Sequence, residues 1–271
     1  MIYNAKNGNI KIENTEMEYV SFGSGDKYLV IIPGLGDALK TVKGTAVPFA
    51  WMYRKFSDEY SVYIFSRKNH LEMGYSTSDM ADEVSYAMNQ LGIDNADIIG
   101  VSQGGMIAQY LAINYPDKVD KLVLAITACR KNETLVKTID KWIDYARKND
   151  YKNLIQNINE KTYTEKRLKY NALMYPILAK FLNREKMERF IIQANACKEH
   201  NAWDEINKIQ AKTLILGGAE DKIVGKEAAA EMASRIPANI LKIYPNLGHG
   251  AYDEAADFNK VILEFLKSNG L

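Results

Sequence analysis

The sequence predicts an α/β fold: a mostly parallel central sheet flanked by helices, with an inserted all-helical segment. Short apolar runs alternate with stretches of helical periodicity up to Ala128, and this alternation resumes at Ala211. Between them, residues 131–208 contain no convincing strand and are predicted to form four or five helices. We therefore expect a core made of residues 1–130 and 209–271, and a helical insertion at 131–208.

The expected strands are short apolar or alternating runs bounded by turn residues. Continuous apolar runs suit strands that are covered on both faces, as in a parallel sheet. The expected strands are 9–22 (two antiparallel strands that turn near Asn14), Tyr28–Ile32, Tyr60–Phe65, 98–101, Lys121–Ala128, Thr213–Leu216 and Ile240–Tyr244.

The helices between these strands are expected from apolar residues at helical spacing and from residues that begin or end a helix. Pro48 suits a first helical turn, and Ser78 with Asp79 suits the start of the next helix. Gly92 ends that helix, and Pro116 ends the one after it. The expected helices outside the insertion are 48–56, 79–91, 103–115, 227–236 and 257–266, and the third helix of the insertion is expected to be interrupted at Pro176.

Composition and charge argue against several classes of protein. The net charge is +1 with no long basic run, which argues against a nucleic-acid partner. No apolar run approaches the ~18 residues of a membrane span, and the N-terminus has no segment of signal-peptide length. Cys129 and Cys197 cannot make a disulfide framework and are expected to be buried thiols of a reducing compartment. We therefore expect a soluble cytoplasmic protein, and no Cys/His spacing predicts a metal site.

The stretch from Asp97 to Tyr110 carries the clearest functional motif. An apolar strand end leads into G-V-S-Q-G, with Gly100, Ser102 and Gly104, and a helical pattern follows. A strand that turns into a helix within three residues lifts its tip side chain clear of the sheet, and it needs small neighbours. A serine there lies at a helix N-terminus, where developing negative charge is favoured. The alternative is a glycine-rich turn with an incidental serine.

A serine nucleophile needs a base, and His249 is the best candidate. It lies between two glycines directly after the last expected strand, whereas His70 and His200 do not follow that strand. A lone histidine in a loop is more often exposed to solvent, so the case for His249 rests on its combination with Ser102.

The base in turn needs an acid to orient it. Asp221 follows the Thr213–Leu216 strand and gives the chain order serine, acid, histidine. Its neighbour Glu220 competes for the same role, but successive residues of an extended segment point to opposite sides. Both acids could also be surface residues of a turn.

Taken together, these motifs resemble the α/β-hydrolase fold superfamily, in its serine-nucleophile, esterase/lipase-like branch with a helical cap. The resemblance covers Tyr28–Ala128 and Lys212–Leu266. The motifs that carry it are G-V-S-Q-G-G at 100–105, P-G-L-G at 33–36, G-A-E-D-K-I-V at 218–224 and G-H at 248–249.

The resemblance implies a role for each motif. Ser102 would be the nucleophile, Asp221 the acid and His249 the base. The backbone N–H groups of Leu35 and Gln103 would form the oxyanion hole, and residues 131–208 would form the cap. The aromatic side chains of that segment are expected mostly to pack within it, with one or two facing a substrate cavity.

Two features depart from the family pattern. Pro33 stands where many relatives have a histidine before the oxyanion glycine. The sequence therefore does not show which side chains support the oxyanion hole. The loop 66–76 lacks the usual arginine- and glycine-rich pattern beyond Arg67, which leaves the far wall of the site undefined. A serine at position 102 excludes the branches that use an aspartate nucleophile.

The resemblance implies a serine hydrolase that cleaves an ester, thioester or lactone through an acyl-enzyme on Ser102, with no cofactor. A small, largely apolar molecule is the expected substrate. Two alternatives stay open. The same residues could serve acyl transfer or carbon–carbon bond hydrolysis, or the protein could bind a small molecule and signal with slow turnover.

Overall fold

The computed structural model describes residues 2–171 and 184–268. In these residues one eight-stranded sheet has the order β1-β2-β4-β3-β5-β6-β7-β8. Strand β2 runs antiparallel to β1 and β4, and the remaining neighbours are parallel, which confirms the expected sheet. The strands are β1 Lys6–Ile12, β2 Thr15–Phe22, β3 Lys27–Ile32, β4 Tyr60–Phe65, β5 Ala96–Val101, β6 Val119–Ala125, β7 Lys212–Gly218 and β8 Asn239–Tyr244.

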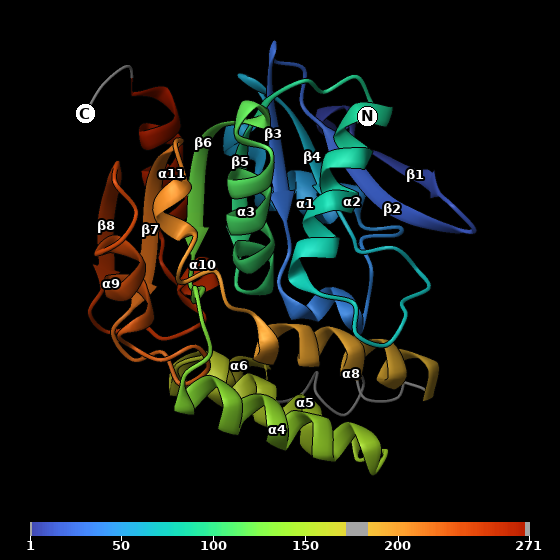
Figure 1. The fold of residues 1–271 in the computed structure, drawn as a ribbon, viewed down its shortest axis with the longest axis vertical. Helices are drawn as coiled ribbons and strands as arrows, with labels where there is room; N and C mark the ends of the chain where they lie inside the picture. Colours follow the sequence, from blue (N-terminus) through green and yellow to red (C-terminus); the bar gives the residue numbers. More distant parts are fainter. Residues whose placement is uncertain (1, 172–183, 269–271) are drawn as a thin grey trace.

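The helices lie on both faces of the sheet and across one of its ends (Figure 1). Within the described ranges, no helix is both long enough and apolar enough to cross a lipid bilayer. The α-helices are α1 Ala46–Met52, α2 Thr77–Gln90, α3 Gln103–Asn114, α4 Glu133–Arg147, α5 Tyr151–Thr162, α6 Glu165–Asn171, α8 Arg184–Glu199, α9 Ala228–Ala233, α10 Ala251–Glu254 and α11 Phe258–Lys267. Short 3-10 turns are η1 Ile2–Asn4, η2 Leu35–Ala38, η3 Arg54–Phe56, η4 Pro116–Lys118 and η5 Ile206–Lys208.

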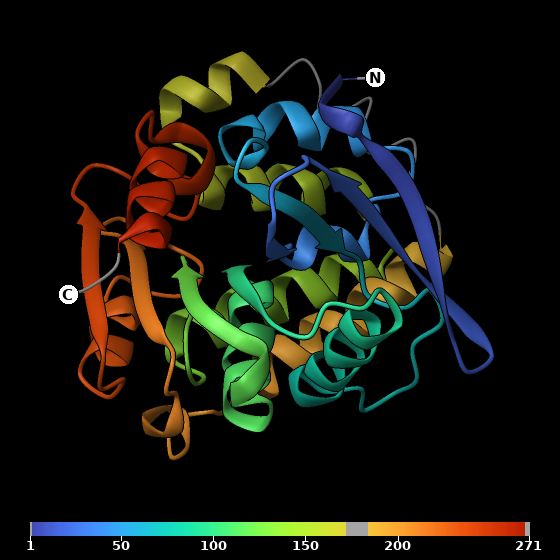
Figure 2. The same ribbon diagram turned by 90° about the horizontal axis from the view of Figure 1, so that it is seen from above.

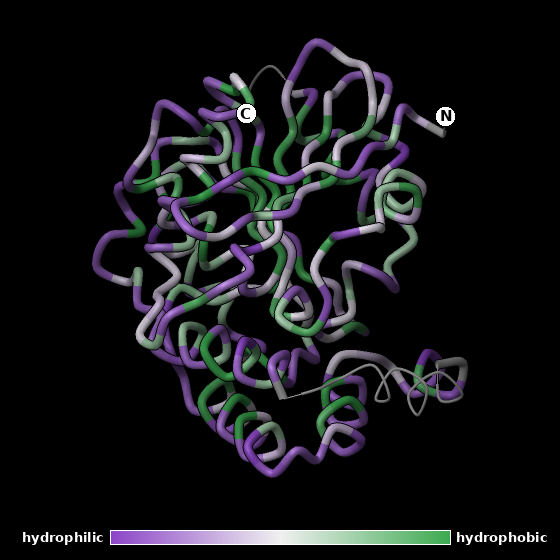
Figure 3. Tube along the Cα trace, turned by 90° about the vertical axis from the view of Figure 1, so that its right-hand side faces the viewer, coloured by the Kyte–Doolittle hydropathy of each residue, from purple (hydrophilic) through white to green (hydrophobic). Residues whose placement is uncertain are grey.

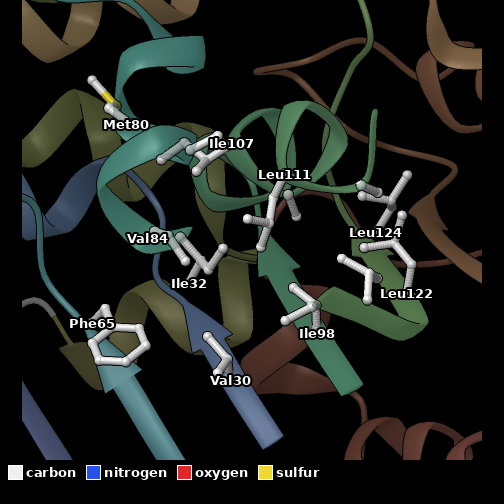
Figure 4. Close-up of a cluster of buried hydrophobic side chains, with 14 of the residues drawn as sticks. Val30, Ile32, Phe65, Met80, Val84, Ile98, Ile107, Leu111, Leu122 and Leu124 are labelled. Carbon is white, nitrogen blue, oxygen red and sulfur yellow. The ribbon is translucent and has the colours of Figure 1, made fainter. Parts of the chain in front are cut away.

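Different helices cover the two faces of the sheet (Figure 2). Along β3, Val30 and Ile32 belong to a buried cluster with α2, α3 and α9, whereas Leu29 and Ile31 belong to one with α1 and α11. Figure 4 shows side chains of α2 and α3 meeting those of β3, β5 and β6 in the first cluster. Burial on both faces explains why the strands are continuous apolar runs, and Figure 3 shows them as hydrophobic segments inside a more hydrophilic periphery.

Helix α2 begins earlier than its sequence suggests. Ser76, not Ser78, is the N-cap, because its hydroxyl accepts the N–H of Asp79 while the Asp79 carboxylate accepts the N–H of Ser76. This reciprocal pair is a capping box, which satisfies two of the free donors at a helix start. Serines at both positions make the sequence signal ambiguous, and the carboxylate at 79 decides in favour of Ser76.

Other boundaries differ by a few residues. Helix α1 begins at Ala46, before Pro48, and β6 ends at Ala125 rather than Ala128. Ile126 has a φ of 45°, a left-handed conformation that ends the extended strand. The short helix α10 was not expected, and the expected interruption at Pro176 falls outside the described residues.

The chain between β6 and β7 is helical in its described part and lies across the end of the sheet (Figure 1). Its helices α4 and α8 pack together, and side chains such as Leu135 and Phe190 share a buried cluster with Met106 of α3 and Val224. These contacts place the insertion over the carboxyl end of the parallel strands.

His200 ties the end of the insertion to the core. Its side chain is buried, with Nδ1 2.9 Å from the hydroxyl oxygen of Thr77 and Nε2 3.3 Å from the side-chain oxygen of Gln109. An amide oxygen can only accept, so Nε2 carries the proton and Nδ1 accepts from Thr77. Burial lowers the pKa of His200 to about 3.

We expect His200 to make the fold acid-sensitive. Because its pKa is lower in the folded state than in the unfolded chain, the stability it contributes is complete above the unfolded value of about 6.5 and falls by up to about 1.4 kcal/mol per pH unit below it. His200→Gln keeps a donor and an acceptor and should flatten the free energy of urea unfolding between pH 7 and pH 4. The exposed His70→Gln is the control, and parallel curves for wild type and His200→Gln would contradict the prediction.

Candidate active site

Ser102 lies at the tip of the turn between β5 and α3. Its φ of 54° and ψ of −117° are rare for a residue with a side chain. The turn is tight: a Cβ on Gly104 would lie 1.9 Å from the carbonyl oxygen of Ile32, and one on Gly100 would lie 2.5 Å from that of Gly104. The expected strand–turn–helix context of the motif is therefore present, and only glycine fits at both flanking positions.

The tip also lies where the strand order reverses. Strands β3 and β5 are neighbours, while β4 lies on the other side of β3 and β6 on the other side of β5. Open α/β sheets bind ligands at the carboxyl ends of the strands at such a point. Here it holds Leu35, which follows β3, and Ser102, which follows β5.

The structure brings Ser102, His249 and Asp221 together. The hydroxyl oxygen of Ser102 lies 3.0 Å from Nε2 of His249, and Nδ1 of His249 lies 2.8 Å from Oδ2 of Asp221. An ionised carboxylate only accepts, so Nδ1 carries the proton and Nε2 is free to accept from the serine. His249 is only 6 % exposed, which excludes the solvated loop histidine.

Asp221 is held by backbone donors as well as by His249. Its Oδ1 accepts from the N–H of Ile223 at 2.8 Å and from that of Val224 at 3.0 Å. Glu220, by contrast, is exposed, and its N–H donates to the carbonyl of Leu247 at 3.0 Å. That bond joins the acid loop to the histidine loop. Of the two adjacent acids, the structure places Asp221 next to His249.

Leu35 and Gln103 are each the first residue of a helical turn, η2 and α3. The N–H groups at a helix start have no acceptor within the helix, so they are free to bind an anion. The loop of Leu35 lies against the serine, because a Cβ on Gly34 would be 3.2 Å from Cβ of Ser102. This placement is compatible with the oxyanion hole that the family resemblance implies.

Arg67 lies next to the residues expected to form the oxyanion hole, where the sequence did not show a supporting side chain. It is buried, and its Nη2 donates to the carbonyl of Pro33 and, at 2.9 Å, to the side-chain oxygen of Gln103. The Pro33 carbonyl thus has a guanidinium partner. The sequence shows Arg67 only as the remnant of an arginine- and glycine-rich pattern and does not predict these contacts.

A cavity of about 380 Å³ opens above Ser102 and His249. One wall comes from α1, with Phe49 and Met52, and another from the insertion, with Leu135, Ile139, Trp142 and Phe190. Among the described residues of the insertion, Trp142 and Phe190 are thus the aromatic side chains that face the cavity. Two hydrogen-bonding groups of the wall are already bound within the protein: Trp142 Nε1 donates to Asn157 at 3.1 Å, and the hydroxyl of Thr162 donates to the Ile158 carbonyl at 2.7 Å. Most of the surface offered to a ligand is apolar.

Both cysteines are buried free thiols, as the sequence predicts. Cys197 lines the cavity, and burial raises its pKa to about 12, so it is a protonated thiol at neutral pH. Within the described ranges no three His, Cys, Asp or Glu side chains gather in a way that could hold a metal ion.

Comparison with known proteins agrees with this architecture. The sequence model of the alpha/beta hydrolase fold family matches residues 27–256. A similar relative, 2-hydroxy-6-oxo-6-phenylhexa-2,4-dienoate hydrolase of Burkholderia cepacia, is 29% identical over 198 residues, which cover 70% of this chain and 68% of that protein.

Two solved structures share the fold over nearly the whole chain. MGS-M2, an alpha/beta hydrolase enzyme from a Medee basin deep-sea metagenome library, has a TM-score of 0.85 and 19% identity over 97% of this chain and 98% of that one. The enol-lactonase from Burkholderia xenovorans LB400 has a TM-score of 0.81 and 19% identity over 96% of this chain and 100% of that one. The family match spans most of the sequence, and the chain belongs to the alpha/beta hydrolase fold family.

Proposed function

We propose that this protein is a serine hydrolase that cleaves an ester bond of a small, largely apolar molecule through an acyl-enzyme on Ser102. The observation that carries the proposal is the chain of contacts from Ser102 to His249 at 3.0 Å and from His249 to Asp221 at 2.8 Å, beneath an apolar cavity. A base within hydrogen-bond reach, itself oriented by a buried acid, is what a serine needs to become nucleophilic.

The proposed reaction has two halves. In the first, the Ser102 oxygen bonds to the substrate carbonyl carbon while its proton moves to Nε2 of His249. The N–H groups of Leu35 and Gln103 stabilise the negative oxygen that forms. The bond to the alcohol oxygen then breaks, and His249 returns the proton to that oxygen. In the second half, water attacks the acyl-enzyme by the same route and releases the acid.

We also propose that residues 131–208 act as a cap on a core made of residues 1–130 and 209–271. Side chains of α4 and α8 that face the cavity support this division, because they cover the site while the proposed reacting groups all come from the core. The cytoplasmic location stays a prediction from the sequence.

The cavity favours a neutral substrate. Among its described lining residues the one cationic side chain is Lys40, which is exposed. A buried carboxylate without a partner is costly, so an anionic group would bind poorly against the apolar walls. A volume of about 380 Å³ lies near the lower end of the range of small-ligand pockets. An ester with a medium-length aliphatic or a single-ring acyl group fits this description.

Carbon–carbon bond hydrolysis is the second candidate, and similarity to the Burkholderia cepacia hydrolase favours it. The compound in that protein's name holds a ketone and a carboxylate but no ester, so water can divide it only by breaking a carbon–carbon bond. The lack of a buried cation among the described lining residues favours the ester instead.

We expect a fluorophosphonate probe to label Ser102, as shown by peptide mapping, and p-nitrophenyl esters to be turned over with a maximum of kcat/KM at medium acyl length. The matched pair is p-nitrophenyl valerate and p-nitrophenyl hemisuccinate, which differ mainly by a carboxylate. We expect at least a tenfold lower kcat/KM for the hemisuccinate, about the factor that 1.4 kcal/mol represents.

Other results would redirect the assignment. Equal rates on the two esters would contradict the neutral-substrate proposal. Faster turnover of a 2-hydroxy-6-oxo dienoate than of any ester would favour the carbon–carbon hydrolase. Labelling of Ser102 with turnover below about one per minute on all of these compounds, against a typical kcat of about 10 per second, would favour a binding and signalling role.

A further inference from the structure

Helix α8 of the insertion reaches the loop of the proposed oxyanion hole through Arg189. Its Nη1 donates to the carbonyl oxygen of Asp37 at 2.6 Å, and its Nη2 lies 3.0 Å from Asp37 Oδ2. Asp37 belongs to η2, the turn that begins at Leu35. The two side chains are only 12% and 1% exposed, so solvent screens this ion pair little. Arg189 thus holds the turn by its backbone and by its side chain.

The same helix also holds the other donor of the proposed hole, Gln103. The side-chain nitrogen of Gln103 donates to the carbonyl of Gln193 in α8 at 2.9 Å, and it lies 3.2 Å from the sulfur of Cys197, also in α8. Its side-chain oxygen accepts from Arg67 at 2.9 Å. Arg67 in turn contacts the turn η2, because its backbone N–H donates to Oδ2 of Asp37 at 3.1 Å.

We propose that Arg189 and the side chain of Gln103 are positioning residues, through which α8 fixes the two backbone N–H groups that receive the negative oxygen. This inference rests on the proposed serine hydrolase function. It makes the insertion part of the catalytic geometry as well as a wall of the cavity. Neither side chain needs to touch the substrate, since each acts through the backbone of η2 or α3.

The composition of this cluster favours positioning over a purely stabilising role. Arg67 Nε and Nη1, Asp37 Oδ1 and the side-chain amide of Gln193 are buried without a protein partner. A buried ion pair of this kind gives little net stability compared with apolar packing. Its directional bonds nevertheless define atomic positions. A misplacement of about 1 Å can lower a rate by about 10²-fold, and loss of one oxyanion donor lowers kcat by about 10²–10³-fold.

The rival role for Arg189 is to bind an anionic group of the substrate. Its two terminal nitrogens are already engaged by Asp37 and by the carbonyl oxygens of Arg67 and Lys68, at 3.1 and 3.4 Å. Arg189 is also not among the residues that line the cavity. Both observations assign the guanidinium to the protein rather than to a ligand.

The test compares Arg189→Met with wild type on the best p-nitrophenyl ester. We expect kcat to fall by about 10–10²-fold with KM within about twofold, because an interaction felt only in the transition state is lost. Affinity for an alkyl trifluoromethyl ketone, whose adduct with serine carries a negative oxygen, should fall by the same factor as kcat/KM. A merely structural role would lower the melting temperature without producing this match.

Lys198→Met is the matched control. Lys198 lies on the same helix and pairs with Asp140 of α4 at 2.9 Å, away from η2, so its loss should leave kcat unchanged. Gln103→Met should resemble Arg189→Met, because it keeps the backbone N–H and removes the side-chain bonds. If Arg189→Met fails to fold, Arg189→Lys keeps a cation beside Asp37 but cannot span the same acceptors, and it should show an intermediate loss.

Unchanged kcat in both Arg189→Met and Gln103→Met, or a rise in KM at constant kcat, would overturn the positioning role. A wild-type kcat in Arg189→Lys would also overturn the positioning role. Failure of the wild-type protein to react with the fluorophosphonate probe would instead overturn the proposed function. Labelled wild type with fully active variants would refute the inference alone.

Discussion

Ser102→Ala is expected to lose nearly all ester hydrolysis while keeping the fold. Alanine can take the same strained tip position, but it would leave His249 without a hydroxyl proton to accept and remove the proposed nucleophile. In one well-studied serine hydrolase the equivalent loss lowers kcat by about 2 × 10⁶-fold. Initial rates on a medium-chain p-nitrophenyl ester, with circular dichroism as the check on folding, measure the effect.

The control is Ser78→Ala, which removes a half-buried hydroxyl from the first turn of α2, at a residue that does not line the cavity. It should hydrolyse the ester at the wild-type rate. If Ser102→Ala retained a tenth of the wild-type rate, the reaction would have to use another nucleophile, and the acyl-enzyme on Ser102 would be wrong.

Asp221→Asn is expected to lower kcat by roughly 10⁴-fold, as the same change does in a serine protease. Asparagine can still accept from the N–H groups of Ile223 and Val224 through its oxygen. It then presents an NH₂ group to Nδ1 of His249, which favours the tautomer with the proton on Nε2. In that tautomer Nε2 points a hydrogen at Ser102 and cannot accept its proton.

Glu220→Gln is the matched control, since it removes the charge of the adjacent acid. Glu220 is exposed, and its backbone N–H rather than its side chain bonds to the carbonyl of Leu247, so turnover should stay within a few-fold of wild type. Both variants should be measured on one ester. A large loss in Glu220→Gln with little in Asp221→Asn would reverse the assignment, and no loss in either would leave His249 without an acid.

The groups brought together at the site could be predicted because each has a local signal. Ser102 needs small residues two positions to either side, and Asp221 and His249 lie in the loops that follow β7 and β8. The carboxyl ends of parallel strands meet at one edge, so position in the chain was enough to bring them near one another. The mostly parallel sheet could be predicted from the sequence as well, because expected strands and helices alternate along the chain.

The supporting cluster could not be predicted in the same way. Arg67 and Asp37 are 30 residues apart, and Arg189 is 152 residues from Asp37, with no local pattern to relate them. The orientation of the insertion helices was equally hidden, because a helical segment with many aromatic residues does not show which of them faces the core. The sequence therefore predicts that one or two aromatic side chains of the insertion face a cavity, but it does not single out Trp142 or Phe190.

The two helices that wall the cavity from the insertion are not equally free to change over evolutionary time. Under the proposed function, Leu135 and Ile139 of α4 would meet a substrate with apolar side chains alone, so a lineage could drift there and acquire a new acyl preference at little catalytic penalty. Helix α8 carries Arg189 and the Gln193 carbonyl, and under the proposed positioning role drift in it would disturb the reaction itself. New selectivity in this protein's descendants would therefore arise first in α4.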